Sequence, residues 1–413
     1  MKTSAKILLF IFTVLSPVVG VSEPHLLTKL SFGENGGRVV RFGDLIGDGQ
    51  SEILTVQNRG QRITCITAYN LDGEVLWQHG RPNPNAHTAP WDLAIQLYDL
   101  NKNGRAEVIF IERTNRLTVL DGISGKRLRR RRVEPRHAFP RDALFIAPLL
   151  KGNRPALIIK NRYTQFWVLN ERLRTVYTRR MSVGHFPTSA RTGQRKAERL
   201  FIGFSAFDFQ GRGAREAWKL PRDRDPYKWH NDAVSVGDLN GDGVPEVAIA
   251  TSKESVLVNG RTGRLIWSKD TRHSQHANIS TNFANFIDRG PRGRLLSFDY
   301  RGRLVFDRGQ QGRVAMLSIV NGWDNSGDYL LVFRRDGMPP VLLSEDGTRE
   351  VELPFPRFPH FAQHFDLSGD LREEILIYDH LGLYIYENNS DETSTLNQQL
   401  PQRRIYNASF YRG

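Results

Sequence analysis

The sequence predicts an all-β protein folded as a single eight-bladed β-propeller, and three observations lead to this fold class. A loop motif rich in acidic side chains recurs four times, and each copy comes directly before a run of β-branched or apolar residues, as at 247–250. A second element, an apolar strand followed by a turn, recurs eight times at a spacing of about 40 to 50 residues. No stretch of useful length has helical periodicity. Repeats of this size without helices are typical of four-stranded blades around an axis.

The N-terminal residues have the layout of a secretory signal peptide. Lys2 and Lys6 precede the apolar run 7–15, and a proline and small residues follow it. The run is too short to span a bilayer comfortably. We therefore expect a signal peptide over residues 1–22 and a propeller over residues 23–413, in a secreted or periplasmic protein with no stable membrane insertion after cleavage. A retained N-terminal anchor is the alternative.

The charge balance indicates an acidic partner. The 413 residues include 58 basic and 44 acidic side chains, which gives a net charge of +14, and 46 of the basic residues are arginine. Export and the lack of a nucleic-acid recognition module favour an acidic polysaccharide over nucleic acid. The stretch 127–132 is interpreted as a solvated blade edge or a surface that attracts anionic polymer. Cys65 is the single cysteine, which excludes a disulfide framework and a cysteine-based zinc site. We expect a monomer.

The strand-and-turn element defines the blades. Its eight copies lie at 71–77, 119–125, 168–170, 207–209, 258–267, 298–302, 343–347 and 385–388. Asp-Gly and Asn-Gly at several of these turns are strong hairpin signals. The copies near 190–210 and 287–306 are weak, so a seven-bladed ring is the alternative. We expect the segment after Glu23 to complete the last sheet, because closure removes exposed edges.

The four acidic loops predict calcium sites. Oxygen-bearing side chains fall at positions 1, 3, 5 and 9, and such hard ligands suit Ca²⁺. The candidate ligands are Asp44, Asp48 and Glu52; Asp99, Asn101, Asn103 and Glu107; Asp238, Asn240, Asp242 and Glu246; and Asp366, Ser368, Asp370 and Glu374. Ile46 replaces a ligand in the first loop and Leu371 replaces the glycine in the last. We expect the ion to hold inter-strand loops rigid; the alternative is that the acids only cap backbone N–H groups.

Histidines are expected at the opposite end of the innermost strands. They precede the loops along the chain, and are His87, His137, His185, His230, His276, His360 and His364. The same region contains Arg136, Arg141, Arg272, Trp91, Trp229, Asn231 and Asp232. Because an innermost strand runs from one face to the other, these side chains should form a funnel on the face away from the acidic loops. Such a pocket is a usual ligand site.

The funnel chemistry suits β-elimination at a uronic acid. Imidazole can abstract or donate a proton near neutral pH, and arginine can neutralise a sugar carboxylate. The candidate catalytic residues are His230, His87, Arg141, Arg272, His276 and His360. We expect His230 and His87 to be the proton-transfer pair and Arg141 or Arg272 to clamp the carboxylate. A hydrolase would need two carboxylates at a set separation, and a three-histidine metal site is less supported because its ligand spacing is not visible.

Three stretches resemble the rhamnogalacturonan lyases of polysaccharide lyase family 11, namely 229–240, 258–267 and 365–375, and the acidic loops resemble the integrin-like FG-GAP and VCBS calcium repeats. The resemblance implies a secreted, calcium-containing eight-bladed propeller that cleaves a rhamnose- and uronate-containing polysaccharide. Asn231 and Leu371 depart from the family pattern, so a rhamnose–glucuronate or ulvan-type linkage is an alternative substrate. A non-catalytic calcium-binding propeller that binds carbohydrate or protein at the cell surface is the alternative function, and another propeller enzyme, such as a hydrolase or a metal-dependent esterase, is a third.

Overall fold

The computed structural model describes residues 23–388, except 61, 88–92, 113–114, 134–140, 162, 194–196, 212, 222–229, 289–292, 310–313, 325–326, 335–337, 358–360 and 371. The side chains of 141–142, 314–316, 322 and 334 also lie outside this description. The signal peptide expected over 1–22 therefore falls outside the described residues.

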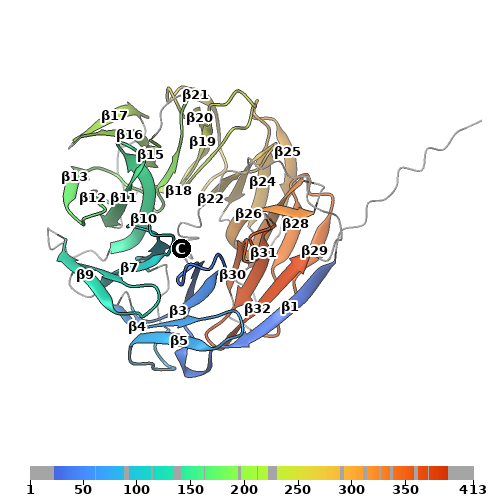
Figure 1. Cartoon of the computed structure of the whole chain (residues 1–413). Helices are drawn as coiled ribbons and strands as arrows, with labels where there is room; N and C mark the ends of the chain where they lie inside the picture. Colours follow the sequence, from blue (N-terminus) through green and yellow to red (C-terminus); the bar gives the residue numbers. More distant parts are fainter. Residues whose placement is uncertain are drawn as a thin grey trace, which may run out of the picture.

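Eight four-stranded antiparallel sheets are arranged in a ring (Figure 1). The first four sheets are β2 (Val39–Gly43), β3 (Glu52–Arg59), β4 (Arg62–Tyr69) and β5 (Val75–Gly80); β6 (Ile95–Tyr98), β7 (Glu107–Glu112), β8 (Arg116–Leu120) and β9 (Arg127–Arg132); β10 (Arg141–Leu150), β11 (Arg154–Asn161), β12 (Gln165–Asn170) and β13 (Thr175–Arg180); and β14 (Thr188–Ala190), β15 (Arg199–Ile202), β16 (Ser205–Gln210) and β17 (Gly213–Lys219).

The second half of the ring repeats the pattern. Its sheets are β18 (Asn231–Gly237), β19 (Glu246–Thr251), β20 (Ser255–Asn259) and β21 (Leu265–Lys269); β22 (Ser274–Ile279), β23 (Ala284–Asp288), β24 (Arg294–Phe298) and β25 (Leu304–Arg308); β26 (Val314–Asp324), β27 (Gly327–Arg334), β28 (Val341–Ser344) and β29 (Glu350–Glu352); and β30 (Phe361–Phe365), β31 (Glu374–Tyr378) and β32 (Gly382–Asn388) with β1 (Pro24–Ser31). The weak repeats form complete sheets, β14–β17 and β22–β25, so the eight-bladed prediction is confirmed.

The ring is closed by its first strand. β1 pairs antiparallel with β32, from Pro24 opposite Asn388 to Ser31 opposite Gly382. This confirms that the segment after Glu23 completes the last sheet. The eighth predicted turn, at 385–388, is wrong: these residues lie inside β32, whose outer neighbour comes from the other end of the described chain.

The first strand of each sheet is the innermost one. First strands of consecutive sheets contact one another, as β2 with β6 and β18 with β22. The second strands are buried along nearly their whole length, because adjacent blades cover both of their faces; β19 and β31 have no exposed residue. The β-branched runs after the acidic loops are these second strands. Each acidic loop thus joins the end of an innermost strand to a buried one.

Tryptophans on the outermost strands form hydrogen bonds between neighbouring blades. The sequence patterns did not predict these contacts. Indole N–H groups donate to carbonyl groups in the next blade: Trp77 to Gly122, Trp218 to Gly260, and Trp267 to Tyr300. The rings lie over glycines of the same turns. At Gly263, whose φ is +72°, a Cβ would meet the Trp218 ring at 2.6 Å. The turn needs glycine both for its backbone conformation and for this close approach.

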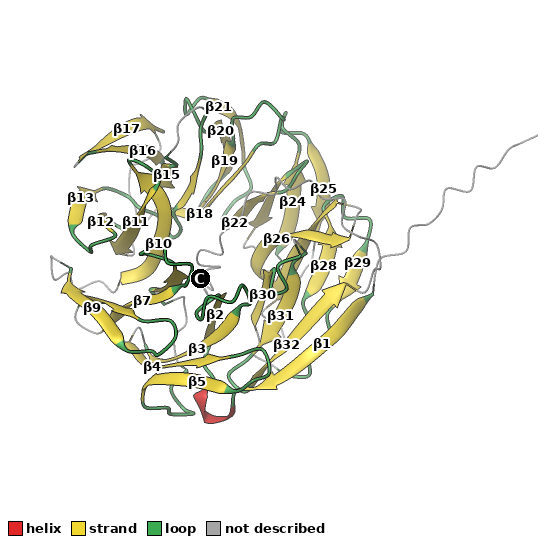
Figure 2. Cartoon of the chain, in the orientation of Figure 1, coloured by secondary structure: helices red, strands yellow, loops and turns green. Residues whose placement is uncertain are grey.

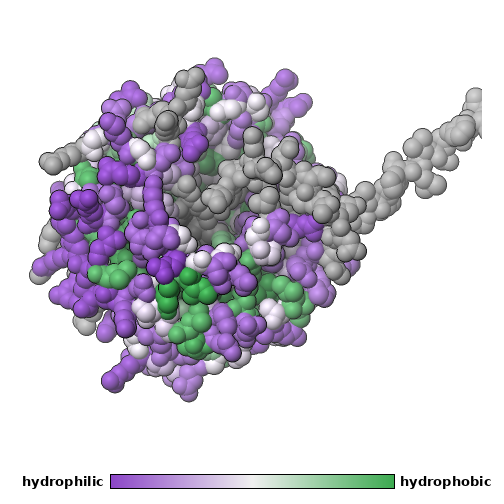
Figure 3. Space-filling model, in the orientation of Figure 1, coloured by the Kyte–Doolittle hydropathy of each residue, from purple (hydrophilic) through white to green (hydrophobic). Residues whose placement is uncertain are grey.

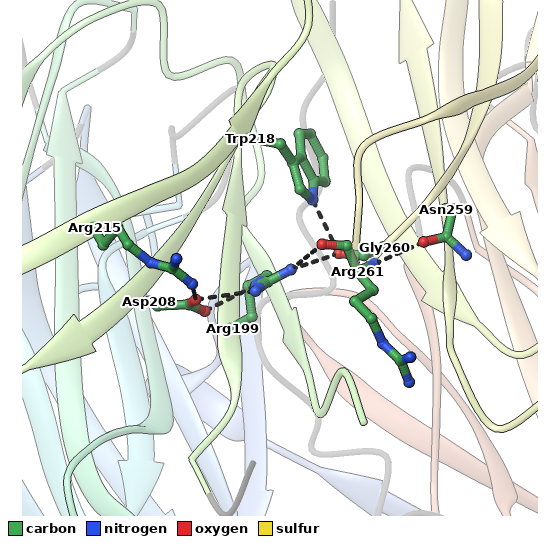
Figure 4. A network of polar contacts seen from close by, with 7 residues as sticks. All are labelled: Arg199, Asp208, Arg215, Trp218, Asn259, Gly260 and Arg261. Carbon is green, nitrogen blue, oxygen red and sulfur yellow. Dashed lines mark hydrogen bonds and ion pairs between the residues drawn. The ribbon is translucent and has the colours of Figure 1, made fainter. Parts of the chain in front are cut away.

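A buried ion pair within the fourth blade is connected to the fifth blade by hydrogen bonds of its arginine (Figure 4). Arg199 forms two hydrogen bonds to Asp208, of 2.8 and 2.9 Å, and its Nη1 donates to the carbonyls of Gly260 and Arg261. Arg215 adds a more exposed contact to the same carboxylate. The prediction of a turn at 207–209 is therefore wrong by a few residues. Asp208 lies within β16, and the hairpin bend follows Gln210.

The outer surface carries much of the basic charge. β9 is the outermost strand of its sheet, and five of its six residues are exposed, which agrees with the blade-edge interpretation of 127–132. Hydrophilic residues cover the side of the ring that carries β9 and β13 (Figure 3). The described residues include one helical turn, the 3₁₀ helix η1 (Gly33–Asn35), drawn red in Figure 2. Among the described residues, no helix is long and apolar enough to cross a membrane.

Candidate functional site

Three histidines from three consecutive blade junctions meet around one buried aspartate. His185 lies in the loop between β13 and β14, His230 directly precedes β18, and His273 directly precedes β22. Asp232 is the second residue of β18. These residues occupy the starting end of innermost strands, away from the acidic loops, as the sequence predicted for the histidine funnel. We call them the Asp232 cluster.

A β-bulge places the aspartate. In β18, Asn231 pairs with Thr251 and Ala233 with the adjacent Ala250, so Asp232 has no partner in the ladder. β22 has the same irregularity at Gln275. Bulges of this kind re-aim a side chain and often occur at functional sites. Gln275 Nε2 donates to Asp232 Oδ1 at 3.2 Å, so the two bulged residues bond across neighbouring blades.

The carboxylate contacts each imidazole through Nε2. Asp232 Oδ1 lies 3.2 Å from His230 and 3.8 Å from His185, and Oδ2 lies 3.1 Å from His273. The side chains of Asp232 and His185 are 1% exposed, whereas His230 is 17% and His273 is 29% exposed. His273 is therefore the most exposed imidazole of the cluster.

The electrostatics of the cluster favour a charged aspartate. Burial acts to raise the pKa of Asp232, but the contacts with His230 and His273 and the positive charge of the imidazoles outweigh it and lower the pKa to about 2. A buried carboxylate in this state needs a balancing cation, either an imidazolium or a metal ion.

Backbone and aromatic contacts hold the imidazoles in place. The backbone N–H of His185 donates to the backbone carbonyl of Asn231 at 3.0 Å. This approach requires Gly184, where φ is +60° and a Cβ would lie 2.5 Å from the Asn231 side chain. The Tyr163 ring lies edge-on to both His185 and His230, at centroid distances of 5.4 and 6.0 Å. The third, fourth and fifth blades thus share one packed polar site.

The other predicted histidines are distributed around the ring. His87 stacks on His380, between the first and eighth blades, with ring centroids 4.2 Å apart. Burial, followed by the charges of His380 and Arg38, lowers the pKa of His87. Because His230 belongs to the fifth blade, the expected pair of His230 and His87 is not in mutual contact but lies across the ring.

His276 and His364 occupy different positions from those expected. His276 is the third residue of β22 and is buried. His364 is the fourth of five residues in β30, so it lies at the acidic-loop end and not in the funnel, and its Nδ1 is 2.9 Å from Glu373. The difference arises because β30 has only five residues, so a histidine two residues before the loop lies at the end of the strand and not at its start.

The structure describes some of the other predicted funnel residues and leaves the rest outside the described part of the chain. Arg272 is adjacent to His273, has a left-handed backbone with φ of 55°, and its N–H donates to Asp270 Oδ1. Several predicted members lie outside the described residues: His360, His137, Arg136, Trp91, Trp229 and the side chain of Arg141. The sequence prediction missed His273, although its place, one residue before an innermost strand, matches that of His230.

In the acidic loops, the carboxylates bond the loop backbone. The glutamate at position 9 accepts from the N–H of the second loop residue in all four loops: Glu52 from Leu45, Glu107 from Leu100, Glu246 from Leu239 and Glu374 from Leu367. The first aspartate also accepts from glycine N–H groups, as Asp238 does from Gly243. These contacts match the capping alternative.

The loop at 238–246 contains a buried carboxylate oxygen that could bind a cation. Glu246 is fully buried, yet its Oε1 has no hydrogen-bond partner. Burial, together with the charges of Asp242 and Asp238, raises the pKa of Glu246 to about 7. Burial, together with the charges of Asp370 and Asp366, likewise raises the pKa of Glu374 to about 7. A hard divalent cation would pair the orphaned oxygen and relieve this repulsion, so the residues present fit Ca²⁺.

Comparisons with known proteins support the fold and the repeat. Residues 230–265, which include His230, Asp232 and one acidic loop, match the FG-GAP repeat family. No curated protein matches the chain. Among solved structures, BamB from Moraxella catarrhalis has 11% identity over 89% of this chain and 99% of its own, with a TM-score of 0.60. The V. cholerae biofilm matrix protein Bap1 has 10% identity over 90% of this chain and 92% of its own, with a TM-score of 0.61.

Proposed function

We propose that this β-propeller with an FG-GAP repeat is an exported lyase that cleaves a rhamnose- and uronate-containing acidic polysaccharide by β-elimination. The observation that carries the proposal is the Asp232 cluster, in which a buried carboxylate lies 3.1 Å from a partly exposed imidazole, that of His273. The basic surface of the ring supports an anionic substrate, and the apolar N-terminal run supports export. Calcium in the acidic loops would stiffen the opposite face.

His273 fits the role of general base better than the residues predicted from sequence. Its Nε2 lies 3.1 Å from Asp232 Oδ2, so the carboxylate would favour the tautomer with the proton on this nitrogen and would leave Nδ1 to accept one. In the reaction, Nδ1 takes the proton from C5 of the uronate. The electron pair forms the C4–C5 double bond, the C4–O glycosidic bond breaks, and the leaving oxygen takes a proton from solvent.

Arginine supplies the second requirement of this chemistry. Removing the C5 proton places negative charge next to the uronate carboxylate, so a cation bound there lowers the barrier. Arg272 is adjacent to the base in the chain, and its guanidinium is the candidate clamp. Arg141 belongs to the third blade and is the other candidate named by the sequence.

The test is turnover of acidic polysaccharides. The mature protein is incubated with rhamnogalacturonan, gum arabic and ulvan in the presence of Ca²⁺, and unsaturated uronate is followed by its ultraviolet absorbance. We expect product from at least one of them, and we expect His273→Asn to abolish it without unfolding the protein. His25→Asn is the matched control, because His25 is half exposed on β1 and bonds Glu387.

The alternative is a non-catalytic propeller that binds carbohydrate or protein at the cell surface. The likeness in fold to a biofilm matrix protein favours it. Binding to these polysaccharides with no absorbing product from any of them would establish this function and refute the lyase.

A further inference from the structure

We propose that His185, His230 and Asp232 form a binding site for one divalent transition-metal ion, with Zn²⁺ as the ion that best fits the ligands. Each residue offers one ligand atom, and the three atoms lie within 4.8 Å of one another. This site is separate from the oxygen loops in position and in chemistry. It does not depend on the proposed lyase activity.

The spacing of the ligand atoms is close to that of a formed site. Zn²⁺ binds imidazole nitrogen and carboxylate oxygen at about 2.0 to 2.1 Å, so neighbouring ligands of a tetrahedral ion are about 3.3 Å apart. Asp232 Oδ1 is 3.2 Å from His230 Nε2, which already matches, and 3.8 Å from His185 Nε2. A shift of about half an ångström would bring the His185 nitrogen to the same distance from Oδ1, and the two imidazole nitrogens already lie within 4.8 Å of each other.

A divalent cation suits the buried groups of the cluster. Asp232 is a buried carboxylate, and the rings of His185 and His230 lie beside it with centroids 5.5 Å apart. Imidazole binds metal in its neutral form, so the ion would supply the positive charge next to the carboxylate. It also pairs the carboxylate that burial isolates from water.

The surroundings hold the ligands in the way that metal sites require. Gln275 fixes the carboxylate by donating to Oδ1, and the backbone of His185 is bonded to Asn231. Tyr163 packs against both imidazoles. Such outer contacts orient ligands and maintain affinity.

The donor set selects the class of metal and leaves a coordination position open. Two imidazoles and one carboxylate suit zinc and other first-row transition metals, whereas Ca²⁺ and Mg²⁺ prefer oxygen alone. Three protein ligands leave the fourth position of a tetrahedral ion for water or an anionic ligand, as in catalytic zinc sites. His273 approaches the other carboxylate oxygen, Oδ2, so it remains outside the three-ligand set.

The test is metal binding by the full mature chain, without an affinity tag that contains histidine. The protein is stripped with a chelator, dialysed against Ca²⁺, and titrated with Zn²⁺, with bound metal measured by elemental analysis and visible absorption recorded after Co²⁺ loading. We expect one equivalent of Zn²⁺ and a tetrahedral Co²⁺ spectrum. Asp232→Asn and His230→Asn should each lower the affinity at least tenfold, and His25→Asn should not change it.

Two outcomes would overturn the inference: no transition metal bound by the native chain, or equal affinity in the Asp232→Asn variant. If the variants do not fold, the native chain decides, because Zn²⁺ should raise its unfolding temperature in a buffer that already contains Ca²⁺; no rise refutes the site. Metal binding without unsaturated product would refute the lyase alone. Product formation by a chain that binds no transition metal would refute the metal site alone.

Discussion

Glu246→Gln offers a direct test of whether the loop at 238–246 needs a cation. The native carboxylate is fully buried, and its pKa is raised from 4.5 to about 7 by burial and by the charges of Asp242 and Asp238. Between pH 4.5 and 7 the folded state therefore holds more protons than the unfolded state. The free energy of unfolding of the calcium-free protein falls as pH rises through this window.

The size of the effect follows from the two pKa values. Because the pKa of Glu246 rises from 4.5 to about 7 on folding, the ionised carboxylate lowers the free energy of unfolding by about 3 kcal/mol above pH 7. Glutamine has the shape of the protonated acid and keeps an oxygen for the N–H of Leu239. In a chelator at pH 8 we expect Glu246→Gln to be more stable than the native chain by up to about 3 kcal/mol, with the difference vanishing near pH 4.5.

Calcium should reverse the sign of the stability difference between Glu246→Gln and the native chain. With excess Ca²⁺ at pH 8 the native glutamate is a ligand, so Glu246→Gln should become the less stable protein. The assay is urea unfolding followed by tryptophan fluorescence, at pH 5 and pH 8, with chelator and with Ca²⁺. A variant that is destabilised equally at both pH values and does not respond to Ca²⁺ would show that the glutamate is only a backbone cap.

Two further substitutions test the contacts between blades. Gly263→Ala should destabilise the protein by about 2 kcal/mol or more, because it strains a positive φ and drives a Cβ into Trp218. Gly211 has a similar φ of +60° but open space around it, so Gly211→Ala should cost only the free energy of the backbone strain. Asp208→Asn should cost about 3 to 5 kcal/mol because it leaves a buried guanidinium without its counter-charge, whereas removing the exposed partner with Arg215→Ala should cost less than about 1 kcal/mol. Urea midpoints measure all four variants, and equal costs within either pair would contradict the reasoning.

The architecture could be predicted from sequence because it repeats. Hairpin turns and acidic loops recur in register with the blades, so their spacing gives the strand order even where single copies are weak. The exceptions are local. Residues 385–388 look like another hairpin, but the closing partner lies more than 350 residues away in β1. Asp208 looks like a turn residue, and only the packing of Arg199 against it shows why it is buried in a strand.

The site could be predicted only in outline. A histidine at the start of each innermost strand was enough to place His230 and Asp232 in the funnel. Selecting the true neighbours required the strand starts and the bulge at Asp232, because one extra residue in a ladder changes which side chain faces the funnel. In the sixth blade the sequence pattern therefore points to His276, whereas His273 makes the contact. The same pattern points to His87, which stacks on a histidine that follows β31 in the eighth blade.

The two oxygens of Asp232 allow a division of roles within one side chain. Oδ1 faces the most buried imidazole, His185, together with His230, where a bound ion would be shielded from water. Oδ2 faces the most exposed one, His273, where a base must meet its substrate. If both proposals hold, a chelator should remove metal from two kinds of site at opposite ends of the innermost strands. Returning Ca²⁺ alone should then restore stability through the acidic loops, while returning Zn²⁺ should add a second rise in unfolding temperature through the Asp232 cluster.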